Sequence, residues 1–470
     1  MNLAKSSVKL FVSNISGALL QFLGITYFAR ELGAAPMGVF FLFQALLGIL
    51  AIPADFGLRG AVEKRISEGK SQGIFLSTTI ALKSIPIVII CILILTFQSV
   101  INNYLGSDLA TLLVIAIVLQ ESAQLAVFVL KGELRVGETA ILNVVRQAIW
   151  VVLGAVLIHY GFQADALIYS LLAGTGLMAC WGWYKCSVRL KKPSIPHAQS
   201  LLDYSKFNVV SSIGGYFYSW MDVAIIGLFL TQSDVGAYET AWRVSAITIL
   251  LSKAIASSIF PQVSQWDADN AIERIESVIY NAITPSIILV IPAFFGTLVL
   301  SGEILGLVFG PEFTIASGVL ILLAGEKILQ SVHVIFGRAL QGINKPKFAA
   351  KATVIAVLLN LILNIVLIQI YGIIGAAVAT TVSFSANTFL HGYYLSKFMK
   401  IKFPTRNVLW SILSSVIMAV GLVGLKDMIH VNTITELAVF IGIGSLIYTS
   451  VLLLYEPIRT KVAVMSPTNL

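Results

Sequence analysis

Charged side chains inside otherwise apolar segments are the residues of this sequence that could do chemistry. Seven basic residues lie in strongly apolar runs, namely Lys83, Arg146, Lys206, Arg243, Lys253, Lys327 and Arg338. The acidic residues in such runs include Asp55, Glu121, Asp222, Glu239 and Glu326. Each charge near the centre of a bilayer costs about 2.5–3.5 kcal/mol on insertion scales, so these groups must be paired or face water. An excess of cations facing water predicts an anionic ligand, and arginine and lysine suit pyrophosphate.

Pairing within one helix accounts for part of this set. Glu239 and Arg243 are four residues apart, which predicts an intrahelical salt bridge. Glu326 and Lys327 are adjacent, so we expect them to point in different directions and to find other partners. The basic residues that are hardest to explain in this way are Lys83, Arg146 and Lys253.

Two stripes of small and polar residues recur at helical spacing. The first contains Asn14, Gly17, Gln21 and Gly24, and the second contains Asn208, Ser212, Gly215, Ser219 and Asp222. Steps of three and four residues place each set on one face of a helix. Such a face suits either a tight helix contact or the wall of a water-filled cavity, and both interpretations stay open. The presence of two matching stripes favours the cavity wall.

The segments that must position these residues are predicted to be membrane-spanning helices. The chain has 470 residues, of which 57% are hydrophobic and only 11% charged, whereas about a quarter are charged in soluble domains. A helix needs about 20 apolar residues to cross a bilayer. The hydropathy pattern predicts an all-α integral membrane protein with fourteen spans, at 8–29, 36–57, 73–97, 107–130, 139–160, 164–186, 203–230, 235–260, 277–300, 315–339, 352–370, 373–396, 408–425 and 435–455.

The basic residues between the spans predict an orientation. With the N-terminus placed in the cytoplasm, 22 lysines and arginines fall on the inside and two, Arg30 and Lys426, on the outside. This bias predicts that both termini are cytoplasmic and that an even number of spans crosses the cell (inner) membrane. It also explains the net charge of +8 through loops that face anionic lipid headgroups, without a nucleic-acid partner.

An internal repeat divides the chain. LKGELRVGET at Leu130–Thr139 aligns with LQGINKPKF at Leu340–Phe348 at an offset of 210, and the first two spans of each half align at an offset of 198. Spans one to six and seven to twelve are therefore predicted to be two parallel copies of a six-helix unit. The predicted domains are a first lobe at 1–186, a basic cytoplasmic linker at 187–202, a second lobe at 203–398, and spans thirteen and fourteen with the tail at 399–470.

Enzyme and metal chemistry find little support in the sequence. The three cysteines and five histidines show no metal-ligand spacing, so no metal site or bound cofactor is predicted. The predicted outer loops have about 4–15 residues, and a membrane polymerase or glycosyltransferase usually needs a larger exterior loop for its catalytic acid. We therefore do not expect an enzyme.

Five stretches spread over both halves resemble one family of membrane proteins. They are ARELGAAPMGVF at Ala29–Phe40, PADFGLRGAV at Pro53–Val62, WMDVAIIGLFLTQSDVGAYETAWR at Trp220–Arg243, FGPEF at Phe309–Phe313, and the block from Gly337 to Thr380. As a set they resemble the Wzx-type polysaccharide exporters of the multidrug/oligosaccharidyl-lipid/polysaccharide (MOP) superfamily. The resemblance implies fourteen helices in two V-shaped lobes, and a flippase that moves an undecaprenyl-pyrophosphate-type lipid-linked oligosaccharide to the outer leaflet by alternating access. The product would serve cell-surface polysaccharide synthesis, such as O-antigen, capsule or exopolysaccharide.

The resemblance transfers site residues only as candidates. The expected headgroup contacts are Arg243, Lys253, Arg146 and Lys83, with Asp222 and Glu239 tuning Arg243, beside the polar stripes described above. Coupling to Na⁺ or H⁺ would need a carboxylate, for which the unranked candidates are Asp55, Glu121 and Glu326. Membrane lipid, a polysaccharide polymerase and a chain-length regulator are the expected partners.

Three other functions remain open. A lipid-linked peptidoglycan precursor flippase would also have fourteen spans and a chemically similar substrate. A multidrug antiporter of the same superfamily would favour an acidic cleft and twelve spans. A membrane polymerase or glycosyltransferase is the least favoured of the three, because the large exterior loop is missing.

Overall fold

The computed structural model of this protein describes the backbone of residues 3–464 and the side chains of residues 16–206 and 219–460. Across the described backbone the chain is built from helices, turns and loops and contains no strand. It forms two compact units, Met1–Gly236 and Ala237–Leu470. The predicted all-α fold is therefore confirmed.

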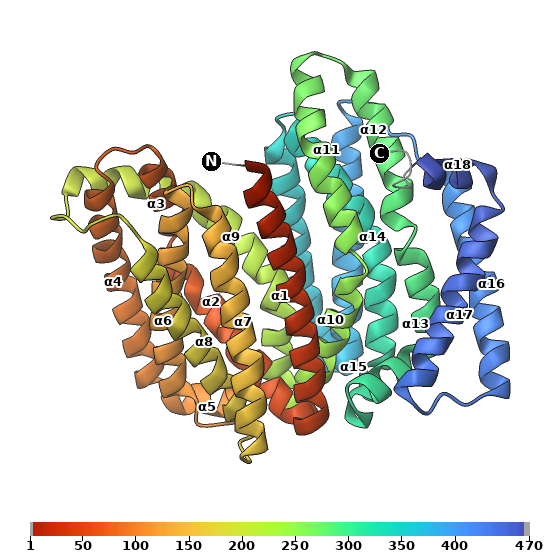
Figure 1. Ribbon diagram of the computed structural model, residues 1–470, viewed down its shortest axis with the longest axis horizontal. Coiled ribbons are helices and arrows are strands. Elements are labelled where there is room, and N and C mark those ends of the chain that lie inside the picture. The colour runs from red at the N-terminus through yellow and green to blue at the C-terminus, as the bar shows by residue number, and fades with distance from the viewer. Residues whose placement is uncertain (1–2, 465–470) are drawn as a thin grey trace. The chain divides into compact units, whose positions relative to one another are not determined.

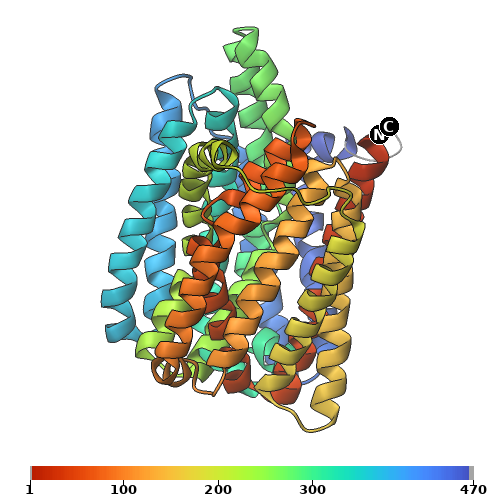
Figure 2. The ribbon, with the colours of Figure 1, turned by 90° about the vertical axis from the view of Figure 1, so that its left-hand side faces the viewer.

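Unit 1 is a bundle of long helices with two short ones (Figures 1 and 2). Its helices are α1 (Leu3–Leu32), α2 (Ala34–Asp55), α3 (Leu58–Ser67), α4 (Gln72–Thr96), α5 (Gln98–Leu105), α6 (Ala110–Gly132), α7 (Val136–His159), α8 (Ala164–Lys185) and α9 (Ile195–Phe229). The helix α9 begins within the segment that the sequence suggests as a linker, because Pro196 is well suited to the first turn of a helix.

Unit 2 contains most of α10 (Gln232–Ile247) and the helices that follow it (Figure 1). These are α11 (Leu250–Ala268), α12 (Ile272–Ile287), α13 (Val290–Val308), a 3₁₀ helix (Pro311–Ala316), α14 (Ser317–Gly342), α15 (Pro346–Ser396), α16 (Thr405–Met428), α17 (Ile434–Leu453) and α18 (Glu456–Val464). Each of the fourteen predicted spans overlaps a helix or two consecutive helices, although several run past a helix end or across a turn.

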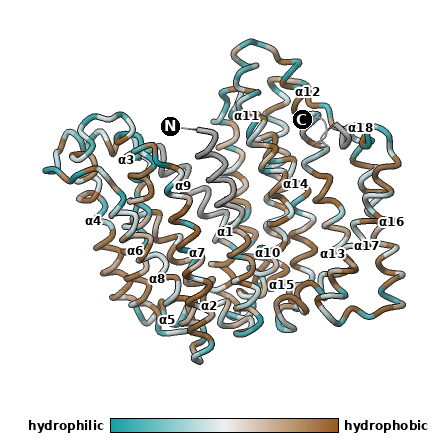
Figure 3. Tube along the Cα trace, viewed as in Figure 1, coloured by the Kyte–Doolittle hydropathy of each residue, from teal (hydrophilic) through white to brown (hydrophobic). Residues whose placement is uncertain are grey.

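The long helices are apolar and their connections are polar, as Figure 3 shows. Among the described residues, ten helices are long and apolar enough to cross a membrane, or up to eleven if α10 and α11, bent by 51°, form one span. The protein is thus a multi-pass membrane protein. The count of fourteen crossings stays a prediction.

The helix α15 is a hairpin of two antiparallel helices. Gly372, with φ of 58° and ψ of −140°, interrupts the helical backbone in a conformation that favours glycine. The Asn360 side chain donates to Thr380 Oγ1 at 3.3 Å across the hairpin, and a Cβ on Gly375 would clash with the Leu367 carbonyl. The two predicted spans at 352–370 and 373–396 correspond to the two arms.

The two aligned loops have the same backbone geometry. Leu134 and Asn344, 210 residues apart, are both left-handed, with φ of 62° and 56°. The next amide closes the same hydrogen bond in each copy, from Arg135 to the Leu130 carbonyl and from Lys345 to that of Leu340, both 2.9 Å long. Each loop therefore ends its helix with a Schellman turn, and the two aligned loops share one backbone geometry.

The glycine before each turn allows one close helix contact. A Cβ on Gly132 would lie 2.8 Å from the Glu63 carbonyl oxygen and from Ile66 Cβ, both on α3. A Cβ on Gly342 would lie 2.6 Å from Val263 Cγ1 on α11. The equivalent contact relates α3 to α11 at an offset of 197, one residue less than in the first spans.

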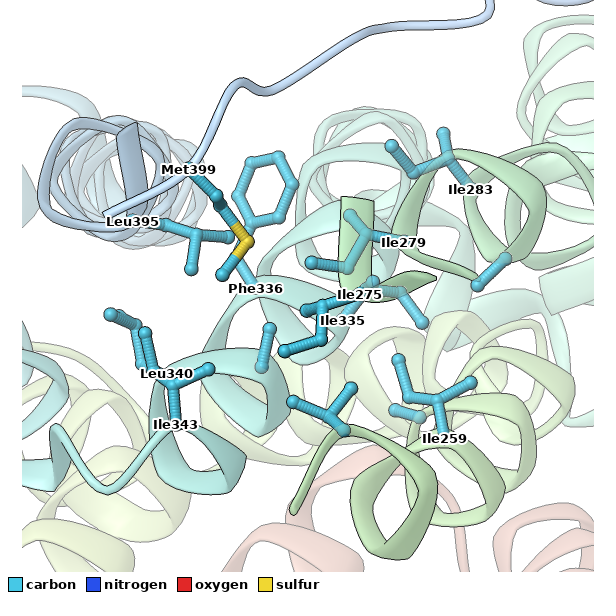
Figure 4. Close-up of a cluster of buried hydrophobic side chains, with 14 of the residues drawn as sticks. Ile259, Ile275, Ile279, Ile283, Ile335, Phe336, Leu340, Ile343, Leu395 and Met399 are labelled. Carbon is cyan, nitrogen blue, oxygen red and sulfur yellow. The ribbon is translucent and has the colours of Figure 1, made fainter. Parts of the chain in front are cut away.

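Apolar side chains fill the space between the helices of unit 2 at the same end as the second loop. Figure 4 shows residues of α11, α12, α14 and the end of α15 meeting in one cluster, including Ile259, Ile279, Ile335 and Leu395. All four of these side chains are less than 5% exposed. Their packing fixes α11, which carries Lys253, and α14, which carries Glu326 and Lys327.

Candidate functional site: a buried charge network

Four charged side chains from four helices meet inside unit 1. Lys83 on α4 places its Nζ atom 2.7 Å from Asp55 Oδ1 on α2 and 2.6 Å from Glu121 Oε2 on α6. Arg59 on α3 contacts the same Asp55 oxygen through Nε at 3.0 Å. The four residues are between 1% and 8% exposed. They form one network, called the charge network below.

A break in the backbone brings Asp55 and Arg59 together. The helix α2 ends at Asp55, and the next two residues, Phe56 and Gly57, are left-handed with φ of 49° and 72°. The Asp55 carboxylate then accepts a hydrogen bond from the Arg59 amide at 3.1 Å, which supplies one acceptor for the first turn of α3. Asp55 therefore ends one helix, caps the next and joins the network.

The charges of the network balance, but its carboxylate oxygens accept unequal numbers of hydrogen bonds. Two carboxylates and two cations sum to zero. Asp55 Oδ1 accepts three close donors, whereas Glu121 Oε1 is buried and has no hydrogen-bond partner among the described residues. The Arg59 guanidinium lies 3.9 Å from that oxygen. Glu121 is thus the member with an open acceptor position.

Unit 2 has neutral residues at the corresponding positions. Ser252 on α11 donates to the Ser286 carbonyl of α12 at 2.6 Å, and its hydroxyl lies 3.0 Å from that of Ser331 on α14. Ser331 follows Glu121 by 210 residues, the offset of the loops, and Ser252 follows Asp55 by 197, the offset of the glycine contacts. Ser286 contributes its backbone carbonyl to this contact, while its own hydroxyl donates to the Ala282 carbonyl of the same helix. All three serines are at most 1% exposed, and they are called the serine set below.

Four of the in-span charged residues of unit 2 form two pairs of their own. The predicted bridge between Glu239 and Arg243 is confirmed, with 2.8 Å between Oε1 and the guanidinium. The prediction for Glu326 and Lys327 is wrong, because their side chains form a pair at 2.6 Å. Adjacent residues do diverge around a helix, but the four-carbon chain of lysine is long enough to fold back. The Lys327 ammonium also lies 5.5 Å from the Trp242 ring centre.

The other two predicted headgroup contacts lie outside any ion pair in the described part of the chain. Arg146 on α7 is half-buried, and its Nε atom is buried without a hydrogen-bond partner. Its backbone packs on α8 at Gly174. Lys253 on α11 is exposed and within electrostatic range of Glu326 and Lys327.

The structure describes the side chains of only part of the two polar stripes. Gln21 and Asp222 are half-buried and Ser219 is exposed. The side chains of Asn14, Asn208 and Ser212 lie outside the described residues. The role of these stripes as a cavity wall therefore stays a prediction.

Sequence reasoning missed one member of the charge network and all of the serine set. Arg59 counts as a loop residue in the positive-inside pattern, yet it is 8% exposed and paired. Its spacing of four residues from Asp55 was the available signal. The serines carry no charge to draw attention, and the repeat offsets identify Ser252 and Ser331 only.

Comparison with known proteins places the chain among membrane transport proteins. The model of the family described as polysaccharide biosynthesis protein matches residues 27–318, and that of the lipid II flippase MurJ matches residues 210–443. The chain is 65% identical to the probable low-salt glycan biosynthesis flippase Agl15 of Haloferax volcanii, over 98% of this chain and 97% of that protein. It is 28% identical to the probable flippase AglR of the same organism, over 96% and 95% of the two chains.

Solved structures show a similar fold. The lipid II flippase MurJ in an inward closed conformation gives a TM-score of 0.81 at 19% identity, covering 95% of this chain and 98% of that one. An inward-facing MATE family multidrug resistance transporter of the MOP superfamily gives 0.61 at 16% identity, covering 83% and 98%. The resemblance predicted from the five quoted stretches is confirmed by the family match and by the Haloferax relative. The chain belongs to the polysaccharide biosynthesis protein family, as a multi-pass membrane member of it.

Proposed function

We propose that this protein is a flippase that moves a lipid-linked glycan from one leaflet of the membrane to the other. The observation that carries the proposal is the 65% identity over 98% of the chain to a probable glycan biosynthesis flippase. At least ten membrane-spanning helices and the MurJ-like fold support it. The protein would act as a transporter and not as an enzyme, because the glycan is moved without being made or cut.

The physical problem that such a protein solves is the polar headgroup. A glycan carries many hydroxyl groups whose hydrogen bonds cannot be satisfied in hydrocarbon, whereas the lipid tail is soluble in hydrocarbon. We propose that the headgroup moves by alternating access while the tail stays in the bilayer. The direction, from the cytoplasmic to the outer leaflet, and the cytoplasmic position of both termini rest on the bias of basic loops.

Arg146 is our first candidate for contact with the phosphate groups of the carrier lipid. Lys83 and Arg243 are held by carboxylates at 2.6–2.8 Å, so their charge is already compensated. Arg146 has a buried Nε atom without a hydrogen-bond partner, and an arginine is suited to bidentate phosphate binding. The exposed Lys253 is the second candidate. An undecaprenyl-pyrophosphate-type carrier fits such cations.

A translocation assay tests the function. The purified protein is reconstituted in vesicles with a fluorescent lipid-linked oligosaccharide, and a membrane-impermeant quencher reports the fraction in the outer leaflet. We expect faster exchange between leaflets than in protein-free vesicles. Extension of the glycan without exchange would instead indicate a polymerase or glycosyltransferase.

The same assay tests Arg146. We expect Arg146→Gln to lower the translocation rate at least about tenfold, the effect of losing roughly 1.4 kcal/mol of interaction with the phosphates. Arg189→Gln, at an exposed arginine after α8, serves as the control and should leave the rate unchanged. Equal rates for the two variants would remove Arg146 from the headgroup site.

A peptidoglycan precursor is the second candidate substrate, because a lipid II flippase model matches residues 210–443. Competition between unlabelled lipid II and an unlabelled lipid-linked oligosaccharide would decide between them. We expect the oligosaccharide to compete better. A polysaccharide polymerase and a chain-length regulator are the proposed partners, and copurification from native membranes tests that proposal.

A further inference from the structure

The serine set shows that neutral side chains at positions equivalent to the charge network are compatible with this fold. In unit 2, the Ser252 hydroxyl connects α11 to the Ser286 carbonyl of α12 and to the Ser331 hydroxyl of α14. In unit 1, four buried charges from α2, α3, α4 and α6 meet instead. A buried ion pair can often be replaced by neutral residues without loss of stability, so packing gives no reason for charges at these positions in one unit and serines at the equivalent positions in the other. The asymmetry points to a task that needs titratable groups.

The geometry of Glu121 indicates which task. The residue is 1% exposed, its Oε2 atom is held by Lys83, and its Oε1 atom has no hydrogen-bond partner among the described residues. A buried carboxylate oxygen without a donor is a position that a proton can occupy. A metal ion is a poorer occupant, since two cationic side chains already lie within 4 Å of this carboxylate.

We infer that the charge network is the proton-binding site of the transport cycle, with Glu121 as the residue that takes up and releases the proton. This inference rests on the proposed flippase function. A hydronium ion of the solvent gives up the proton, so that one of its O–H bonds breaks as an O–H bond forms at Oε1 of Glu121, and a water molecule is released. Lys83 remains an ammonium group and is retained by Asp55. The network passes from zero net charge to +1.

The added charge couples the protonation of Glu121 to the conformation of the protein. An uncompensated charge in a site that is at most 8% exposed costs several kcal/mol, so the protonated network favours a conformation in which water reaches it. A proton that binds two conformations with different affinity shifts the equilibrium between them by that difference. Proton uptake and release at Glu121 therefore bias the conformational equilibrium of the transport cycle.

Other charged groups lie on the network helices and on the helices packed against them. The helices α2, α3, α4 and α6 contribute the four network residues, and α3 also carries Glu63, Lys64 and Arg65 towards its end. The helices packed against these four bring the further charged residues Arg30 and Glu31 on α1, Glu138 and Arg146 on α7, Asp165 and Lys185 on α8, and Asp203, Lys206 and Asp222 on α9. Several of these are paired elsewhere, such as Lys185 with Glu138 and Lys206 with Asp203.

The test compares four proteins in vesicles that carry the fluorescent lipid-linked oligosaccharide, with and without a pH gradient. They are the wild type, Glu121→Gln, the quadruple variant Asp55→Ser, Arg59→Ala, Lys83→Ser, Glu121→Ser that makes the whole charge network neutral, and the control Glu68→Gln at the exposed partner of Arg65. If one proton is exchanged per glycan, a gradient of about one pH unit shifts the leaflet distribution about tenfold. We expect this shift in the wild type and in the control, and its loss in both network variants.

A proton titration of the same purified proteins is independent of the transport assay. We expect the wild type to take up one proton more than Glu121→Gln over the pH range in which both stay folded. Equal uptake, or a gradient effect that survives in Glu121→Gln, would overturn the inference, and so would a wild type that responds only to a Na⁺ gradient. Absence of any glycan exchange by the wild type, with the extra proton still taken up, would reject the flippase function and leave the proton site standing.

Discussion

At the scale of single residues, the central feature is one lysine shared between two carboxylates. Lys83 is 2% exposed and lies within 2.7 Å of both Asp55 and Glu121. The desolvation of these charges is offset only while every member keeps its partners. The charge network is therefore tolerant of neutral replacement as a set and intolerant of the loss of one member.

Lys83→Met tests this asymmetry. The substitution leaves two carboxylates in a buried site with Arg59 alone, and we expect it to lower the free energy of unfolding by about 3–5 kcal/mol. Lys206→Met is the matched control, because Lys206 and its partner Asp203 are exposed, and its effect should stay below about 1 kcal/mol. Thermal and denaturant unfolding in detergent measure both. A loss in Lys83→Met no larger than in Lys206→Met would contradict the account.

The sequence predicts the members of such a site better than their contacts. Asp55, Lys83 and Glu121 stand out because charge is rare in apolar segments, and this requires no knowledge of the fold. Their pairing depends on how three helices pack, which residues separated by 28 and 38 positions cannot reveal by local spacing. The error at Glu326 and Lys327 has a related origin, since helix geometry fixes where Cβ points and not where a long side chain ends.

At the scale of elements, each of the two repeated basic loops connects two helices and packs against a third. These loops are called joints below. Both end a helix with a left-handed residue and place a glycine against a neighbouring helix, α3 in one unit and α11 in the other. The sequence reveals this repeat because glycine and the turn residues are constrained by the backbone itself. The short helices α3 and α5 and the bends near Phe56 and Thr248 are absent from the prediction, since apolar windows average over such breaks.

Alanine at each joint tests the close contact. We expect Gly132→Ala and Gly342→Ala to destabilise the protein by about 1–3 kcal/mol each, because the new Cβ would lie within 2.6–2.8 Å of the neighbouring helix. Gly176→Ala on α8 is the control, with the nearest atom 3.9 Å from its Cβ. Unfolding measurements should separate the two joint variants from the control. Wild-type stability in both would show that the joints are not tightly packed.

At the scale of the whole molecule, orientation and span number follow from the loops. Cysteines placed at Lys347 and at Asn432, in a chain with Cys91, Cys180 and Cys186 replaced by serine, test the orientation. Both positions are exposed. We expect a membrane-impermeant maleimide added to intact cells to label the cysteine at 432 and not the one at 347. The reverse pattern would invert the proposed direction of transport.

The translocation time course tests whether this protein is a lipid-linked glycan flippase. In sealed vesicles without protein, the quencher reaches only the outer-leaflet part of the fluorescent lipid-linked oligosaccharide, and the rest stays protected. The account predicts that this protein makes the protected part accessible to the quencher while the vesicles stay sealed to a soluble dye. A protected part that stays as large as in protein-free vesicles, with folded protein present, would contradict the assignment of this chain as a lipid-linked glycan flippase.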